Sequence, residues 1–564
     1  AETQQSFLNY LDSQVSVGNV ISYRSHWISN IVIVKAKADF FKNMPPRPDI
    51  DNIYYNYETE NIKPESSTIP EPDDIQNVEI GVEVIRAPEV WSLGITGSGR
   101  LAANIDTGVD GNHPALNNRW RGYDPRYQDH PEWAWFDPYL GQNDFPYDNG
   151  GHGTHTMGTV CGADPNTGDT VGVAPGAEWM AAGAIDRGGG IPRTVADAIA
   201  SFEWMVDPDG NPVTYWDVPD VCSNSWGVTT GHGYPPCDET FWEYLDACEA
   251  AGIVIIFSAG NEGYSGLRRP ADRATTDFNA FSVGAIDPLN MQIASFSSRG
   301  PSYCTSGGDA AIKPEISAPG VNTRSCYPGG GYTTMSGTSM ASPHINGVVA
   351  LMREANPNLG VDLIKEILLD TAVDAGDPGE DNDYGHGIVD AYEAVQRAIA
   401  LLEGYGLLVG QVTDEVTGDG LPAIVEVTNR DMPTIARCNG EGFYQLYIPA
   451  DTLWLLEAGF PPDFLPDFDQ ITVAENETVT VNFQLEPKVE VVLRAQFANP
   501  DDVSYRDFYV RGTWDENGFW RQEPSDEFIV LRDDGAAPDE IEGDGIFTGS
   551  IKLAADMDHT YQWA

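Results

Sequence analysis

The pattern of hydrophobic and polar residues changes twice along the chain and divides it into three kinds of sequence. Residues 1–72 predict a small α+β unit, because short apolar runs follow a helical repeat, and they end in a linker rich in Pro, Ser and acidic residues. The elements expected there are helices at 7–11 and 38–41 and strands at 20–23, 31–34 and 53–55.

Residues 73–403 alternate short apolar runs with helical stretches, which is typical of a parallel sheet flanked by helices. In such a sheet ligands bind beyond the carboxyl ends of the strands, so polar residues directly after the apolar runs are the functional candidates. The expected strands lie at 101–105, 218–222, 253–257 and 281–283, and the expected helices at 195–205, 241–251, 345–354, 362–369 and 389–402.

From residue 404 the helical periodicity stops, and strands alternate with turns rich in Gly, Asp and Pro. Residues 404–486 predict a small β-sandwich. Residues 487–564 predict a second β domain. Because strand-like residues run up to Ala564, we expect this domain to be truncated and the native chain to continue.

The chain of 564 residues is strongly acidic, with 86 acidic and 31 basic residues and a formal net charge of -55. This charge repels nucleic acid and anionic membranes, so neither is expected as a partner. No apolar run is long enough to span a membrane. The charge fits an extracellular or saline setting, where salt screens the repulsion.

The seven cysteines are sparse and odd in number, so at least one thiol is unpaired within the chain. None has the CxxC spacing of a metal site. In an oxidising compartment Cys304 could pair with Cys326, and Cys237 with Cys222 or Cys248. Free buried thiols are an equal alternative.

Four polar residues stand on separate loops of the α/β region. Asp106 and Asn261 each follow an apolar run, and His152 lies among glycines that leave room for a second chain beside its ring. Ser339 lies on a turn of small residues before an apolar helical pattern. Alone, a serine in this position is usually a helix cap.

Together the four residues supply the parts needed for acyl transfer. Ser339 would attack and His152 would remove its proton. Asp106 would hold the ring and stabilise the imidazolium, while Asn261 and the Ser339 N–H would stabilise the oxyanion. Coincidental polar loop residues are the alternative interpretation.

The segments DTGVDGNHPAL, GHGTHTMGT, SAGNEG and GTSMASPH, in this order, resemble the signature blocks of the subtilisin-like serine peptidases, and most of all their bacillopeptidase F-like branch. The resemblance covers residues 80–396. It includes the family's order of Asp, His and Ser along the chain. It places the triad on Asp106, His152 and Ser339 and the oxyanion donor on Asn261. It makes His155 a structural residue.

This resemblance implies an α/β fold, with a subtilisin-like parallel sheet flanked by helices, a small α+β propeptide-like domain before it and β-sandwich domains after it. It implies a secreted serine endopeptidase that needs no cofactor for its chemistry. Residues 1–72 resemble the family's propeptides, so we expect a zymogen that is cut between residues 55 and 75. An ordinary accessory domain is the alternative for this segment.

The resemblance also implies how a peptide binds, by pairing with an edge strand of the peptidase. Arg268 and Arg269 lie where it places the floor of the pocket. An inward arginine would favour acidic or polar side chains, whereas solvent-facing arginines would only balance the acidic surface. The implied substrate-binding residues are Ser225, Trp226, Gly227 and Gly260.

The region after residue 403 carries weaker signals. Residues 404–486 resemble carboxypeptidase regulatory-like β-sandwiches, which implies stability, spacing or binding. A competing interpretation of the whole chain is therefore a catalytically silent binding or adhesion protein that works through residues 404–564. The acidic loop at 533–545 could wrap a structural Ca²⁺ or be merely solvated. Its candidate ligands are Asp533, Asp534, Asp539 and Asp544.

Overall fold

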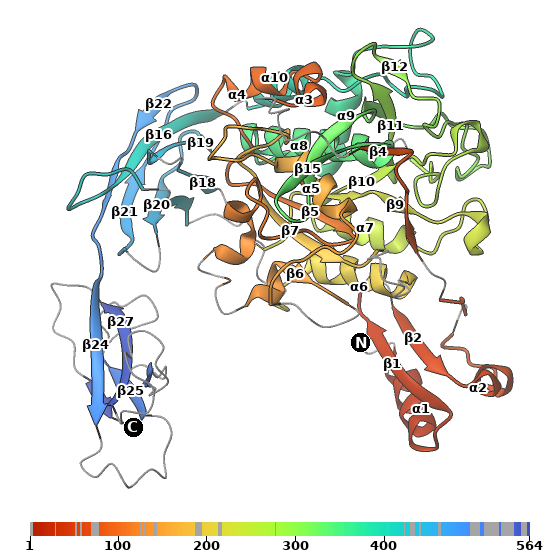
Figure 1. Cartoon of the computed structure of the whole chain (residues 1–564), viewed down its shortest axis with the longest axis horizontal. Coiled ribbons are helices and arrows are strands. Elements are labelled where there is room, and N and C mark those ends of the chain that lie inside the picture. The colour runs from red at the N-terminus through yellow and green to blue at the C-terminus, as the bar shows by residue number, and fades with distance from the viewer. Residues whose placement is uncertain are drawn as a thin grey trace. The chain divides into compact units, whose positions relative to one another are not determined.

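The structure is a computed structural model, and it forms two compact units, Ala1–Leu402 and Glu403–Ala564 (Figure 1). It describes residues 4–28, 30–50, 53–56, 59–68, 78–124, 127, 130–138, 144–185, 194–211, 217–276, 278–402, 404–421, 423–428, 435–438, 441–460, 464–496, 508–512, 529–531, 546–553 and 561–563. Of the residues from 489 onward only the backbone is described.

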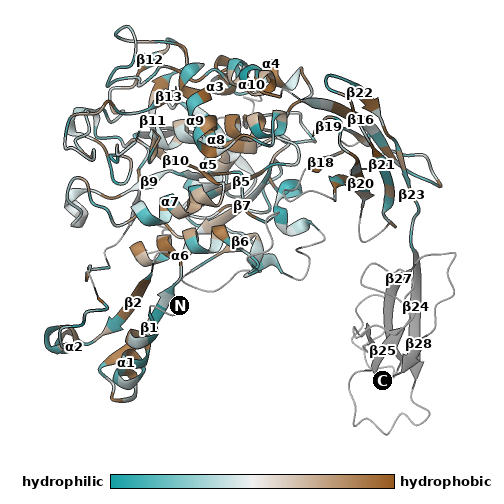
Figure 2. Ribbon diagram, turned by 180° about the vertical axis from the view of Figure 1, so that it is seen from behind, coloured by the Kyte–Doolittle hydropathy of each residue, from teal (hydrophilic) through white to brown (hydrophobic). Residues whose placement is uncertain are grey.

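The first unit begins with the predicted α+β arrangement. Helix α1 (Gln5–Ser16) packs against the antiparallel pair β1 (Val20–His26) and β2 (Ile31–Ala36), and α2 (Ala38–Asn43) follows. Strand β2 is hydrophobic along most of its length (Figure 2). The strand expected at 53–55 is wrong, because the structure has no strand there and all three side chains are exposed.

An eight-stranded sheet forms the centre of this unit. Every neighbouring pair of its strands is parallel except β11 with β12, as expected for an α/β fold. The order is β12-β11-β10-β8-β5-β7-β6, and β13 also pairs with β11. The strands are β5 (Leu101–Asp106), β6 (Trp135–Phe136), β7 (Glu178–Gly183), β8 (Val221–Asn224), β10 (Val254–Ser258), β11 (Phe281–Asp287), β12 (Gln292–Ile293) and β13 (Ile316–Pro319).

Both faces of the sheet are buried along its central strands β5, β7, β8 and β10, which is why these strands are mostly apolar. In β10, Val254 and Ile256 face the core that contains α8, while Ile255 and Phe257 face the core that contains α6 and α7. The helices are α3 (Ile80–Val84), α4 (Ala87–Trp91), α5 (His152–Cys161), α6 (Val195–Val206), α7 (Trp242–Ala250), α8 (Thr338–Ala355), α9 (Val361–Asp370) and α10 (Ala391–Ala400).

A smaller sheet joins distant parts of the first unit. Strands β14 (Thr323–Tyr327) and β15 (Gly331–Ser336) form a hairpin directly before α8. Strand β4 (Ser66–Thr68), from the N-terminal region, adds to the edge of β15. The N-terminal region is therefore hydrogen-bonded to the segment that leads into Ser339.

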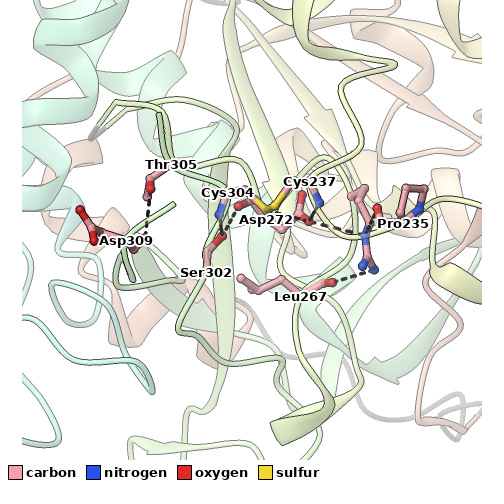
Figure 3. The surroundings of a disulfide bond; sticks show 9 residues. Pro235, Cys237, Leu267, Asp272, Ser302, Cys304, Thr305 and Asp309 are labelled. Carbon is pink, nitrogen blue, oxygen red and sulfur yellow. Dashed lines mark hydrogen bonds and ion pairs between the residues drawn. A yellow bond between two sulfur atoms is a disulfide. The ribbon is translucent and has the colours of Figure 1, made fainter. Parts of the chain in front are cut away.

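One disulfide joins Cys237 and Cys304, whose Cα atoms are 5.0 Å apart (Figure 3). The pairings predicted for these two cysteines are wrong. Cys222, Cys248 and Cys326 are instead free and buried on β8, α7 and β14. A disulfide requires close Cα atoms and matching side-chain directions, which the spacing of cysteines along a chain does not report.

The second unit contains the predicted β-sandwich, two four-stranded sheets with an apolar core. Side chains along β16 alternate between buried and less buried positions, as expected when one face of a sheet packs on another. One sheet contains β16 (Tyr405–Asp414), β19 (Phe443–Pro449), β22 (Thr478–Thr480) and β23 (Phe483–Leu485). The other contains β17 (Ile424–Val427), β18 (Ile435–Arg437), β20 (Trp454–Gly459) and β21 (Asp467–Ile471).

The last part of the chain also consists of strands, as predicted. β24 (Val489–Gln496) pairs with β27 (Ile546–Leu553), and β25 (Phe508–Gly512) pairs with β26 (Ile529–Leu531) and β28 (Tyr561–Trp563). The calcium ligands predicted at 533–544 lie outside the described residues. Within the described ranges, no helix is long and apolar enough to cross a membrane.

Candidate active site

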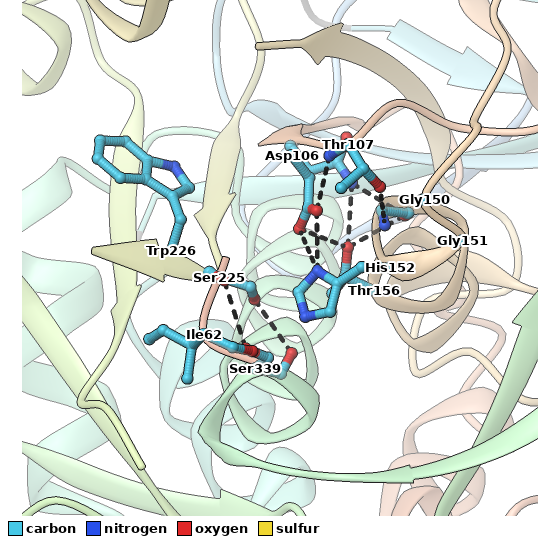
Figure 4. A network of polar contacts seen from close by, with 12 residues as sticks. Ile62, Asp106, Thr107, Gly150, Gly151, His152, Thr156, Ser225, Trp226 and Ser339 are labelled. Atoms are coloured by element: carbon cyan, nitrogen blue, oxygen red, sulfur yellow. Dashed lines mark hydrogen bonds and ion pairs between the residues drawn. The ribbon is translucent and has the colours of Figure 1, made fainter. Parts of the chain in front are cut away.

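Asp106 and His152 meet at the carboxyl edge of the central sheet (Figure 4). Asp106 is the last residue of β5, and His152 is the first residue of α5. The His152 Nδ1 atom lies 2.8 Å from Oδ1 and 3.1 Å from Oδ2 of Asp106. Because an ionised carboxylate only accepts hydrogen bonds, Nδ1 carries the proton and donates it, which leaves Nε2 as the basic nitrogen.

The buried Asp148 holds the start of α5. Its Oδ1 accepts from the N–H groups of Gly150 and Gly151, each at 2.8 Å. Its Oδ2 accepts from the Thr154 N–H at 2.9 Å and the Thr154 hydroxyl at 2.7 Å. Burial raises the pKa of the Asp148 carboxyl, and these donors oppose that effect. The carboxylate thus fixes the turn that presents His152.

The glycine after His152 permits a close backbone contact. A Cβ atom on Gly153 would lie 2.1 Å from the carbonyl oxygen of Gly108, so only glycine fits there. The Gly153 N–H donates to the Thr107 hydroxyl at 2.8 Å. The glycines beside His152 were expected to leave room for a second chain. The loop that follows Asp106 occupies this room.

Ser339 is the second residue of α8 and is fully buried. Its Oγ lies 3.1 Å from the carbonyl oxygen of Ile62 and 3.3 Å from that of Ser225, so its proton is directed to one of these acceptors. Figure 4 shows His152 between Asp106 and Ser339. The N-terminal end of α8 favours negative charge beside it, which suits a serine oxygen that acts as a nucleophile.

Asn261 lies at the same site, in the loop after β10. Its Oδ1 accepts from both the N–H and the hydroxyl of Thr338, each at 3.0 Å. These bonds turn Nδ2 into the cleft, where it donates to the carbonyl oxygen of Lys63 at 3.0 Å. Thr338 and Asp148 are not among the residues predicted from the sequence, although each stands within a few residues of a predicted catalytic residue.

The chain's own N-terminal region occupies the predicted peptide-binding edge. Strand β3 (Glu60–Asn61) pairs antiparallel with β9 (Trp226–Gly227), and the Ile62 N–H donates to the Ser225 carbonyl at 3.4 Å. The indole of Trp226 is fully buried against the rings of Phe241 and Phe257. Trp226 therefore contributes to this pairing through its backbone.

The pocket region contains an arginine that is already paired. A Cβ atom on Gly227 would lie 2.8 Å from the Arg268 Cβ, and one on Gly260 would lie 3.1 Å from the Arg268 Cγ. Arg268 is buried, and its Nη2 lies 2.7 Å from the Glu262 carboxylate. Arg269 is buried too, so the interpretation of both arginines as solvent-facing is wrong.

The other two candidates near the motifs have structural partners. The Nε2 of His155 lies 3.1 Å from the Thr323 carbonyl oxygen, and burial lowers the pKa of His155 to about 3. The carboxylate of Asp110 accepts N–H bonds from Asn112 and Gly329. The contact of His155 agrees with the structural role that the resemblance implies for it.

Comparison with known proteins gives the chain relatives over most of its length. A profile of the subtilase family matches residues 97–387. Bacillopeptidase F of Bacillus subtilis (strain 168) is 38% identical over 438 residues, which cover 73% of this chain and 29% of that protein. Subtilisin BL of Lederbergia lenta is 32% identical over 324 residues, 57% of this chain and 100% of that protein.

The crystal structure of fervidolysin from Fervidobacterium pennivorans, a keratinolytic enzyme related to subtilisin, is similar with a TM-score of 0.52 and 20% identity. This match covers 93% of this chain and 85% of that chain, and at this identity it supports the fold alone. The chain thus spans less than a third of Bacillopeptidase F but the whole of Subtilisin BL. The profile and the sequence relatives show that the chain belongs to the subtilase family of serine peptidases.

Proposed function

We propose that the chain is a secreted serine endopeptidase, made as a zymogen, that cleaves peptide bonds of proteins through an acyl-enzyme. One observation carries the proposal. The Ser339 hydroxyl faces a peptide carbonyl, that of Ile62, beside a histidine that Asp106 holds in one tautomer. This is the arrangement that nucleophilic acyl transfer requires.

In the proposed reaction Ser339 Oγ attacks the carbonyl carbon, and its proton passes to Nε2 of His152. Asp106 stabilises the resulting imidazolium, while Asn261 Nδ2 and the Ser339 N–H donate to the oxyanion. His152 then protonates the leaving amine, the C–N bond breaks, and an ester on Ser339 remains. Water attacks this ester with His152 again as the base, and Ser339 Oγ regains its proton.

The N-terminal region would inhibit this site by binding as a substrate does. Residues 60–62 extend the sheet at β9, and the Glu65 N–H donates to the Ser336 carbonyl at 2.8 Å on the other side of Ser339. Farther away, His26 Nδ1 lies 2.5 Å from the Glu203 carboxylate of α6. The segment is thus bound on both sides of the nucleophile and docked on the peptidase surface.

Within this segment we place the maturation cut between Ile62 and Lys63. The Ile62 side chain is fully buried, as expected for the residue whose side chain fills the pocket, whereas Lys63 is exposed. Asn261 donates to the Lys63 carbonyl, one residue beyond the carbonyl that faces Ser339. Cleavage therefore requires a small shift that brings Asn261 to the Ile62 oxygen and the Ser339 proton to His152.

Secretion is supported by the Cys237–Cys304 disulfide, because such bonds persist in oxidising compartments. A binding or adhesion protein on an inactive scaffold is the competing class. Such a protein would not require a nucleophile, a base and an oxyanion donor arranged beside two successive peptide carbonyls.

The test compares the full chain with Ser339→Ala after incubation of each purified protein. We expect the wild type to release an N-terminal fragment and show a new N-terminus at Lys63, and Ser339→Ala to stay intact. Casein hydrolysis should require Ser339 and stop with a serine-directed covalent inhibitor. Intact mass and N-terminal sequencing report the cut.

Two matched substitutions test the position of the cut. Ile62→Asp places a charge in the buried position and should slow maturation, whereas Ile53→Asp changes an exposed residue of the same region and should not. If wild type and Ser339→Ala show the same mass and the same casein hydrolysis, the peptidase proposal fails. A new N-terminus elsewhere in an active chain rejects only the assigned bond.

A further inference from the structure

A second polar pair, Asn104 with Thr156, lies next to Asp106 and His152 between β5 and α5. Asn104 precedes Asp106 by two residues, so both side chains lie on the same face of the strand. Thr156 follows His152 by four residues, so both lie on the same face of the helix. Two residues of a strand span about 6.6 Å and four residues of a helix about 6 Å. The strand and the helix therefore bring this pair together just as they bring Asp106 and His152 together.

A hydrogen bond joins the two side chains of this pair. The Nδ2 group of Asn104 donates to the Thr156 hydroxyl oxygen and to the Gly153 carbonyl oxygen, each at 3.1 Å. Because a carbonyl oxygen only accepts hydrogen bonds, the amide of Asn104 has one orientation. Both protons of Nδ2 are then used, and the Thr156 hydroxyl accepts one of them while it keeps its own proton to donate.

The Thr156 proton has two acceptors within reach, the Gly153 carbonyl oxygen at 3.1 Å and Asp106 Oδ2 at 3.4 Å. Figure 4 shows the Thr156 side chain beside His152, with its hydroxyl turned toward Asp106. The Gly153 oxygen already accepts from Asn104, whereas in the described part of the chain His152 is the only other donor to Oδ2. A charged carboxylate is also the stronger acceptor, which favours the bond from Thr156 to Asp106.

Asn104 is a costly residue at its position in the sheet. The residues on either side of it, Ala103 and Ile105, are apolar and fully buried, and Asn104 itself is 1% exposed. Its Oδ1 is buried and has no hydrogen-bond donor among the described residues. An amide oxygen in this state destabilises the fold, which an apolar side chain would not do. A role beyond stability is therefore needed to explain Asn104, and its Nδ2 group contacts Thr156.

We propose that Asn104 and Thr156 are positioning residues for the catalytic site, an inference that rests on the proposed function. The Asn104 amide donates to the Thr156 oxygen, the Thr156 proton goes to Asp106 Oδ2, and the carboxylate is held against His152. A carboxylate that is already oriented stabilises the imidazolium without reorganising when the ring takes the Ser339 proton. Both residues act through Asp106 and touch neither the substrate nor a reacting atom.

Thr156→Val tests the bond to Asp106, because it removes the hydroxyl and keeps the shape of the side chain. We expect kcat to fall about two- to tenfold with little change in KM, since the bond supports the imidazolium and not substrate binding. Without the hydroxyl, Oδ2 depends on His152 alone, so the protonated ring becomes the better partner. The acid limb of the kcat/KM profile should therefore move to higher pH, by at most about one unit.

Thr156→Ser restores the hydroxyl and should restore both kcat and the acid limb. The matched control is Thr159→Val on the same helix. Thr159 is also fully buried, but its hydroxyl donates to the His155 carbonyl at 3.2 Å instead of to the triad. This variant should leave kcat and the acid limb unchanged. Thr156→Ala repeats the test if Thr156→Val does not fold.

Asn104→Val, alone and combined with Thr156→Val, tests the order of the contacts. Alone it should lower kcat less than Thr156→Val does, because the hydroxyl stays in place. If Asn104 acts through Thr156, the double variant should lose no more activity than Thr156→Val alone. Losses that multiply in the double variant would show that Asn104 acts independently of Thr156 and would refute its role in this chain of contacts.

All variants are measured as full chains after self-incubation, on one peptide substrate. Titration with a serine-directed covalent inhibitor gives the concentration of active sites, so that kcat refers to folded, mature enzyme only. If the parent neither cleaves the peptide nor reacts with the inhibitor, the proposed function fails and this inference fails with it. If the parent is active but Thr156→Val keeps its kcat and acid limb, or Thr159→Val loses as much, only the roles of Asn104 and Thr156 are wrong.

Discussion

Thr338 connects Ser339, the proposed nucleophile, to Asn261, the proposed oxyanion donor. Its N–H and hydroxyl both donate to Asn261 Oδ1, and its hydroxyl oxygen accepts from the Gly260 N–H at 3.2 Å. The amide of Asn261 can therefore adopt only one orientation, with Nδ2 toward the cleft. A donor that is oriented before the reaction stabilises developing charge better than one that must first reorient.

We expect Thr338→Val to lower kcat by about two- to tenfold with little change in KM, because one neutral hydrogen bond is worth about 0.5–1.5 kcal/mol and the Thr338 N–H remains. Asn261→Ala removes the donor itself and should lower kcat by about 10²–10³-fold, the loss known for an oxyanion donor in a related subtilisin. Steady-state kinetics on one peptide measures both effects. Thr338→Ser should retain near-normal kcat, and an equal loss in Ser and Val variants would contradict the orientation argument.

At the residue scale, the sequence predicts candidate residues from their side-chain type and from their positions on loops next to predicted strands or helices. Asp106, His152, Ser339 and Asn261 were all named, and the structure brings them together beside two successive peptide carbonyls, those of Ile62 and Lys63. Thr338 was missed because its partner Asn261 lies 77 positions away, and only the fold brings the two into contact.

The start of α8 shows why the boundaries of elements were harder to predict. The helix was expected from residue 345 but starts at Thr338, because small residues and Pro343 interrupt the apolar pattern in its first turns. Pro343 lacks the N–H that would donate to the Ser339 carbonyl, and the Ser225 hydroxyl donates to that carbonyl at 3.0 Å instead. A side chain from another loop thus makes this helical turn stable.

In the N-terminal region, strand propensity did not predict which residues form a strand. The β-branched and aromatic residues at 53–55 have high strand propensity, yet they do not form a strand and their side chains are exposed. Glu60 and Asn61 have no apolar pattern but form β3, since the exposed edge of β9 offers backbone hydrogen bonds. Strand formation here depends on the partner, which the local sequence does not encode.

The buried histidine of α8 makes stability depend on pH. His344 Nδ1 lies 2.9 Å from the Met340 carbonyl, and burial lowers the pKa of His344 to about 4. Its pKa in the unfolded chain is about 6.5, so between these values the unfolded state binds more protons. The stability that comes from a neutral His344 is fully present above pH 6.5 and is lost as the pH falls toward 4.

We expect His344→Asn, which keeps a donor for Met340, to remove this dependence. Below pH 6.5 the free energy of unfolding of the parent should fall by up to about 1.4 kcal/mol per pH unit relative to that of the variant. Urea unfolding at pH 7.5, 6.5 and 5.5 in the Ser339→Ala background measures it. A His344→Asn curve that runs parallel to the curve of the parent would refute the argument.

For the whole molecule, charge is the property that the sequence predicts best, because it does not depend on the fold. The 31 basic residues can neutralise at most 31 of the 86 acidic residues, which leaves the net charge of -55. Several basic side chains are buried in pairs, such as Arg324 with Asp169 and Arg268 with Glu262. The excess acid therefore repels itself, and this repulsion is stronger in the compact state than in the expanded chain.

Salt should therefore stabilise this protein. The screening length is about 30 Å at 0.01 M and about 10 Å at 0.1 M ionic strength, so most of the gain in Tm should occur in this range. Thermal scans of the Ser339→Ala chain over this range of ionic strength measure it. NaCl and KCl should act equally at equal ionic strength, because screening does not distinguish the two cations. A Tm that is flat or falls with salt would mean that the surface carboxylates are too far apart, or too protonated, for their repulsion to affect folding.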